Sequence, residues 1–70
     1  NAIDRAYLKT LHTTYKGGPT GVKTIAASMN EEEATLEDVI EPYLMQIGLI
    51  EKTTRGRMIT DAGKEYLMDK

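Results

Sequence analysis

The chain has 70 residues, a formal net charge of −2 and no cysteine. A chain this short buries enough apolar surface for one core only, so we expect residues 1–70 to form a single domain. Without cysteine there is no disulfide framework and no thiolate metal site, and an intracellular setting is favoured. No apolar run reaches the roughly 18 residues of a membrane span, and no signal-peptide pattern is present, so no contact with a membrane is expected.

The charges are unevenly distributed along the chain. Residues 1–23 hold four bases and one acid, residues 24–51 hold seven acids and no base, and residues 52–70 hold five bases and three acids. The net charges of the three stretches are therefore +3, −7 and +2. Opposite charges on different parts of a small domain indicate two different surfaces.

Two helices are predicted in the first half of the chain. Apolar residues recur at steps of three and four over residues 2–15, which is typical of a helix with one buried face. Glycine and proline at positions 17–19 end this helix. A second, shorter helix follows on Val22, Ile25, Ala26 and Met29.

A third helix has the strongest apolar pattern. Thr35 followed by Asp38 resembles a capping arrangement and predicts its start. Pro42 lies inside the pattern, so we expect a bend near residues 38–42 rather than an end. Gly48 then stops the helix. The stripe expected to face the core consists of Leu36, Val39, Ile40, Tyr43, Leu44 and Ile47.

The chain closes with a hairpin and a last helix. Two strand-like runs, 49–52 and 57–60, flank a four-residue turn at 53–56 that contains glycine. Thr60 or Asp61 is expected to cap the last helix, which carries Ala62, Tyr66 and Leu67. The fold class is therefore mainly α with a small β-hairpin. It is a winged helix, in which the second and third helices form a helix-turn-helix and the hairpin is the wing.

The wing is the best candidate for a binding site. Arg55 and Arg57 lie two residues apart, Gly56 lets the turn fold tightly, and Thr53 and Thr54 add hydroxyl donors. Such a cationic hairpin can lie along a groove and neutralise phosphates. The alternative is an ordinary solvated turn that uses its charge for solubility.

The third helix lacks the side chains that read bases. Its expected exposed positions include Glu37, Asp38 and Glu41, and its one typical base reader, Gln46, lies at the wrong end. We therefore expect DNA binding without sequence preference, which argues against a sequence-specific repressor. A second hypothesis is a protein-docking module that uses the acidic 31–41 face.

Catalytic, nucleotide and metal sites find little support. Residues 17–24 superficially resemble a phosphate loop, but Val22 interrupts the required Gly-Lys-Thr succession and no buried strand precedes it. His12 is the single histidine, so no ligand set surrounds it in the sequence. An enzyme acting alone is the least favoured class, because no catalytic constellation is present.

Three segments resemble the C-terminal winged-helix domains of RuvB-type Holliday-junction branch-migration helicases. They are GGPTG at 17–21, TLEDVIEPYL at 35–44 and TRGR at 54–57. The likeness covers nearly the whole chain in one register. The resemblance implies a cytoplasmic, hexameric AAA+ ATPase that moves four-way junctions in recombination, repair and the SOS response, with RuvA as partner. ATP and Mg²⁺ would bind in upstream domains, so this domain would hold no cofactor and would not itself be an enzyme.

The resemblance also implies site residues. Relatives touch the backbone of duplex DNA through wing positions that match Lys52 and Arg57, so the predicted DNA-binding set is Lys52, Thr54, Arg55, Gly56 and Arg57. Lys52 replaces an arginine that is common in relatives, which keeps the charge but loses the guanidinium fork. Glu33 stands where some relatives carry a base, so that contact is not expected here.

Overall fold

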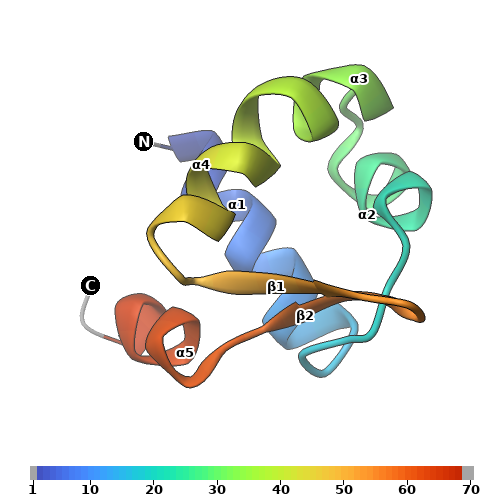
Figure 1. Cartoon of the computed structure of the whole chain (residues 1–70). Helices are drawn as coiled ribbons and strands as arrows, with labels where there is room; N and C mark the ends of the chain where they lie inside the picture. The colour runs from blue at the N-terminus through green and yellow to red at the C-terminus, as the bar shows by residue number, and fades with distance from the viewer. Residues whose placement is uncertain (1, 69–70) are drawn as a thin grey trace.

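The computed structural model describes residues 2–68, which form three helical segments, a β-hairpin and a closing helix (Figure 1). The predicted element order and the winged-helix plan, mainly α with a small hairpin, are therefore confirmed. In chain order the elements are α1 (Ala2–Lys9), the π-helical turn η1 (Thr10–Thr14), α2 (Val22–Met29), α3 (Glu33–Thr35), the π-helical turn η2 (Leu36–Ile40), α4 (Glu41–Gln46), β1 (Ile50–Thr53), β2 (Gly56–Ile59) and α5 (Asp61–Met68).

The helix predicted over residues 2–15 forms as α1 followed by η1. Tyr7, Leu8 and Leu11 are buried in the core, whereas Ile3, at the start of the helix, remains 37% exposed. The helix ends where residues 16–18 take positive φ angles, and the backbone N–H of Gly17 donates to the Leu11 carbonyl at 2.8 Å. The predicted stop at residues 17–19 is thus confirmed.

The third predicted helix consists of α3, η2 and α4 in succession. It begins at Glu33, because Glu32 still has an extended backbone with φ −79° and ψ 140°. The predicted start at Thr35 was wrong, since Thr35 already has helical dihedral angles and its side chain caps nothing. The π-helical turn η2 occupies residues 36–40, directly before Pro42 at the start of α4, which places the irregularity where a bend was predicted.

Half of the apolar stripe on the third helix faces solvent. Leu36, Ile40 and Leu44 are buried in the core. The other three residues are exposed, Val39 to 62%, Tyr43 to 49% and Ile47 to 46%. The prediction that all six pack inward was therefore wrong for these three.

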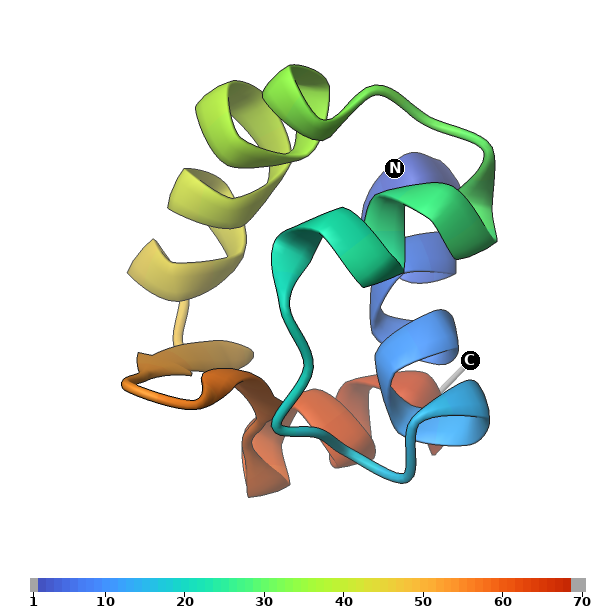
Figure 2. The ribbon, with the colours of Figure 1, turned by 90° about the vertical axis from the view of Figure 1, so that its right-hand side faces the viewer.

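The two strands pair antiparallel, with Ile50 opposite Ile59 and Lys52 opposite Arg57. The strands are shifted by one residue from the prediction, so the turn consists of residues 54–55 alone. Figure 2 shows the hairpin below the third helix, with its turn projecting at the lower left. The wing therefore extends from the body of the fold on the side of α4.

Helices and hairpin share one cluster of buried apolar residues. The Thr60 hydroxyl caps α5 by accepting the Gly63 backbone N–H at 3.0 Å, and Leu67 of α5 packs against the cluster. No helix within residues 2–68 is both long and apolar enough to cross a membrane. The cluster consists of Tyr7, Leu8, Leu11, Val22, Ile25, Ala26, Leu36, Ile40, Leu44, Leu49, Ile50 and Ile59.

Candidate nucleic-acid interface

The wing, residues 50–59, ends in a tight turn with its own hydrogen bonds. The Thr53 hydroxyl donates to the Gly56 carbonyl at 2.7 Å and accepts the Arg55 backbone N–H at 3.1 Å. Thr53, which we considered as a phosphate donor, therefore has its hydroxyl engaged within the turn. This bonding fixes the backbone from which Thr54 and Arg55 project.

The segment at residues 17–20 anchors the wing to the body of the fold. Thr20 and Arg57 exchange two backbone hydrogen bonds, from Thr20 N–H at 3.0 Å and from Arg57 N–H at 2.7 Å. The Ile59 N–H also donates to the Gly17 carbonyl at 3.0 Å. The wing is thus held along β2 by a third stretch of backbone and is not a free arm.

Close backbone contact explains the glycine at position 56. Gly56 has a φ of +135°, and a Cβ there would lie 2.7 Å from the backbone N and carbonyl carbon of Thr20. A side chain would therefore be strained by the dihedral angle and would overlap the anchoring segment. Gly56 is buried, so its observed role is to let two stretches of backbone approach.

The predicted site residues divide by exposure. Lys52, Thr54 and Arg55 are exposed on or beside the turn, whereas Arg57 keeps only 11% of its side chain exposed. Lys52 and Arg57 are directly opposite each other, so they project from the same face of the hairpin. The cations of the wing that are open to an approaching phosphate are therefore Lys52 and Arg55.

Arg57 is bound to a buried carboxylate. Its Nε and Nη2 donate to Oε2 and Oε1 of Glu41, both at 2.9 Å. The Tyr7 hydroxyl donates to Glu41 Oε2 at 2.6 Å, and Glu37 Oε2 lies 3.9 Å from Arg57 Nη2. This bidentate pair joins β2, α4 and α1, so it fixes the wing relative to the third helix.

The prediction that Glu41 is exposed on the third helix was wrong, because Glu41 is only 1% exposed. The spacing of apolar residues could have indicated that Glu41 is buried. Glu41 stands three residues before the buried Leu44, at the edge of the inward stripe. The partner, however, lies on another element sixteen residues away, and no helical pattern could identify it.

The network holds both of its donors in their protonated forms. The hydrogen bonds from Arg57 to Glu41 raise the pKa of the guanidinium above its ordinary value. Burial, and secondarily the hydrogen bond to Glu41, raise the pKa of the Tyr7 hydroxyl well above its ordinary value of 10.0. Arg57 is therefore charged and Tyr7 neutral around neutral pH, and the charge of Arg57 is balanced by its partner. The phosphate contacts predicted for Arg57 and Gly56 stay predictions.

The outward side of the third helix is acidic and apolar. Glu37 and Asp38 are exposed next to Val39, and the exposed Glu32 and Glu33 lie just before them in the chain. Carboxylates in this position repel the phosphates of DNA. The structure therefore puts opposite charges on the wing and on the helix beside it.

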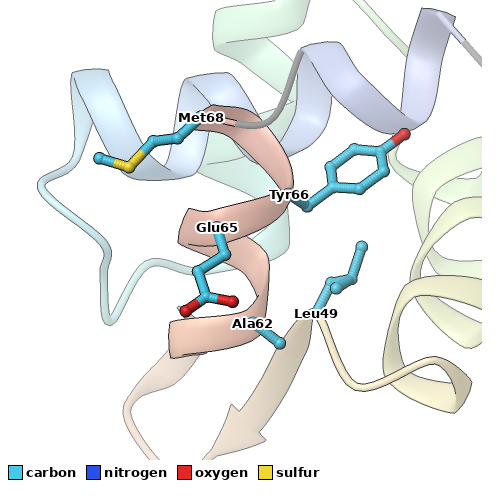
Figure 3. A pocket seen from close by; sticks show the side chains of 5 residues that line it. All are labelled: Leu49, Ala62, Glu65, Tyr66 and Met68. Carbon is cyan, nitrogen blue, oxygen red and sulfur yellow. The ribbon is translucent and has the colours of Figure 1, made fainter.

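A shallow hollow of about 530 Å³ lies on α5, beside Leu49 (Figure 3). Tyr66 and Met68 point to opposite sides of α5, and Glu65 is its single carboxylate among the lining residues. The lining groups do not converge on one point, as the polar groups of a ligand site do. Within residues 2–68, no cluster of three or more histidine, aspartate and glutamate residues could hold a metal ion.

Comparison with protein families matches residues 1–68 to a family model described as the RuvB C-terminal winged helix domain. The Holliday junction branch migration complex subunit RuvB of Prochlorococcus marinus is 48% identical over 97% of this chain and 19% of its own length. The same subunit of Ligilactobacillus salivarius is 56% identical over 91% of this chain. The chain therefore spans about a fifth of the length of these relatives.

Solved structures agree with these matches. The Thermotoga maritima RuvB Holliday junction branch migration motor superposes with a TM-score of 0.94 and 43% sequence identity. The superposition covers 97% of this chain and 23% of that one. Fold and sequence thus point to the same domain of one family.

Proposed function

Because this chain belongs to the family of RuvB C-terminal winged-helix domains, we propose that it binds the backbone of duplex DNA without sequence preference, as the DNA-contacting domain of a branch-migration helicase. One observation carries the proposal. The wing projects from the fold with Lys52 and Arg55 exposed, while the base-reading position of the fold, the third helix, presents acids. Contacts to phosphates position a protein on DNA but carry no sequence information.

The charges favour one orientation on DNA. A winged helix that reads sequence inserts its third helix into the major groove. Here Glu37 and Asp38 would meet phosphates, and each would oppose that approach. Docking through the turn of the wing, with the third helix turned away, brings Lys52, Thr54 and Arg55 to the backbone. Of the two acids, Glu37 remains beside the wing, 3.9 Å from Arg57.

The relatives also suggest what the whole protein that contains this domain does. We assign ATP and Mg²⁺ binding, and helicase activity, to the parts of the relatives that this chain does not span. We further propose that the whole protein forms a homohexamer on a four-way junction, with RuvA as a partner. Its proposed role is in DNA recombination, repair and the SOS response in the cytoplasm. In a hexamer, several weak wing contacts would act at high effective concentration, so one wing with two free cations is sufficient.

The test is fluorescence anisotropy of the 70-residue chain on several duplexes of unrelated sequence and on a four-way junction, at low and moderate salt. Reading even one base pair is worth about 1–3 kcal/mol, so duplex affinities that agree within about fivefold indicate no base readout. We expect that agreement, together with a loss of affinity as salt rises whose log–log slope is about −2, as two phosphate contacts imply. A strong preference for one duplex sequence would contradict the proposal.

A second candidate function, protein docking through the acidic 31–41 face, is favoured by one observation. The helix that carries these acids also exposes three large apolar side chains. Charge reversal at Glu32, Glu33 and Glu37 separates the two functions, because loss of assembly with intact DNA binding would indicate docking.

A further inference from the structure

The third helix has a broad apolar face made of two neighbouring rows, and the domain covers only one of them. Leu36, Ile40 and Leu44 form the buried row. Val39, Tyr43 and Ile47, spaced four residues apart, form a second row, which we call the outer ridge. The exposed fractions of these three side chains are 62%, 49% and 46%, so the outer ridge is an apolar strip that the domain itself leaves uncovered.

The ridge continues onto α1. A hollow of about 260 Å³ is lined by Asp4, Val39, Ile40 and Tyr43, so the start of α1 borders the ridge. Ile3, next to Asp4, adds another exposed large apolar side chain at this edge. The hollow has room for a large side chain from a partner, and tyrosine beside such a pocket is a common anchor of protein interfaces.

Duplex DNA does not fit this surface. The ridge is flanked by the exposed carboxylates of Glu37 and Asp38, and it carries no base. A phosphate backbone would meet apolar and negatively charged groups there. The occupant is accordingly a protein surface.

We propose that the outer ridge docks against the domain that precedes this one in the same polypeptide. In the relatives about four fifths of the chain lies outside the matched stretch, and the matched domain is the C-terminal one. That preceding chain enters at the start of α1, beside Ile3 and Asp4, which is the edge of the ridge. Because the two domains are covalently connected at this point, the preceding domain is held close to the outer ridge.

The size of the ridge favours a tethered occupant over a second copy. A stable interface between free proteins uses about 20–30 residues on each side. The outer ridge and Ile3 supply four large apolar side chains. A small contact of this kind is sufficient only when the partner is held at high effective concentration, as a neighbouring domain of the same chain is. Docking here leaves the wing free for DNA.

The test measures the accessibility of a single thiol, which is straightforward because the chain has no cysteine. Val39→Cys is placed in the isolated 70-residue chain and in the full-length subunit that contains it, and the rate of maleimide labelling at that peptide is followed by mass spectrometry. Ala27→Cys, at an exposed position of α2, is the matched control. Circular dichroism checks that each variant folds, and Ile47→Cys provides a second probe of the ridge.

We expect Val39→Cys and Ile47→Cys to react at least tenfold more slowly in the full-length subunit, diluted until it is monomeric, than in the isolated chain, and Ala27→Cys to react equally in both. Equal rates at the ridge would overturn the proposal. Slower labelling of the isolated chain as its own concentration rises would also overturn it, because the occupant would then be a second copy. Protection of the ridge by added duplex DNA would overturn it in favour of a DNA-facing third helix.

Discussion

Replacing Glu41 with glutamine is expected to lower the free energy of unfolding by roughly 3–5 kcal/mol, the usual cost of removing one partner from a buried ion pair. Glutamine has nearly the same size but is neutral, and its amide donates where the carboxylate accepts. Arg57 would then be a charged group with 11% side-chain exposure and no counter-charge at hydrogen-bond distance. The Tyr7 hydroxyl would lose its charged acceptor and could donate only to the neutral amide oxygen.

Urea denaturation followed by circular dichroism measures this effect. Small domains have total stabilities of about 5–15 kcal/mol, so the variant would be close to unfolding at moderate temperature. Glu37→Gln is the matched control, because Glu37 lies 3.9 Å from the same guanidinium but is 47% exposed in its side chain. An exposed pair contributes about 0–1 kcal/mol, so the control is expected to change little. Equal effects of the two substitutions would show that the buried pair does not hold the wing.

Gly56→Ala is expected to destabilise the chain by about 2–4 kcal/mol, from backbone strain and overpacking together. Alanine at a φ of +135° is strained, and its Cβ would lie 2.7 Å from backbone atoms of Thr20 that cannot move independently of the anchoring segment. The wing would have to separate from residues 17–20, so the backbone amides of Thr20 and Arg57 should exchange faster with solvent.

Gly21→Ala is the control for this substitution. Gly21 has an ordinary φ of −72°, and a Cβ there would meet no atom within 4 Å. Alanine at such a position is neutral or slightly stabilising, by up to about 1 kcal/mol, because it restricts the unfolded chain. If Gly56→Ala is as stable as Gly21→Ala but loses DNA affinity, Gly56 is a DNA contact and the packing explanation is wrong.

The fold was largely predictable from local patterns. Glycine and proline at 17–19, Gly48 and the hairpin turn each impose a specific backbone geometry, so the element order followed from them. The π-helical turns could not be predicted, because such turns are rare within helices and the spacing of apolar residues does not mark them. The start of the third helix was misplaced for a related reason, since Thr35 has a capping side chain that the structure does not use.

The two rows of the third helix show a limit of periodicity. Rows 36–40–44 and 39–43–47 are offset by three residues, so both lie within one broad apolar face of a helix. The sequence shows that this face is apolar but not which part of it the domain itself covers. That distinction depends on where α1 and α2 pack, and the uncovered row carries the inferred docking surface.

The candidate site was predictable as a charged hairpin, but the division of roles within it was not. Arg55 and Arg57 are equivalent in the sequence, two cations flanking a glycine. In the structure one projects from the turn and the other binds Glu41. Long-range pairing of this kind has no local signal, since it is set by the tertiary contact between the hairpin and α4.

The most direct test of this account compares the salt dependence of DNA binding for the wild type, Lys52→Ala/Arg55→Ala and Lys64→Ala. We expect the double variant to lose most of its affinity, and its plot of log affinity against log salt to be shallower by about 2, one counterion for each lost phosphate contact. Lys64 is an exposed base on α5, outside the wing, so its removal should leave the slope unchanged. If the double variant binds like the wild type, the exposed wing cations are not the DNA contact and the central claim is contradicted.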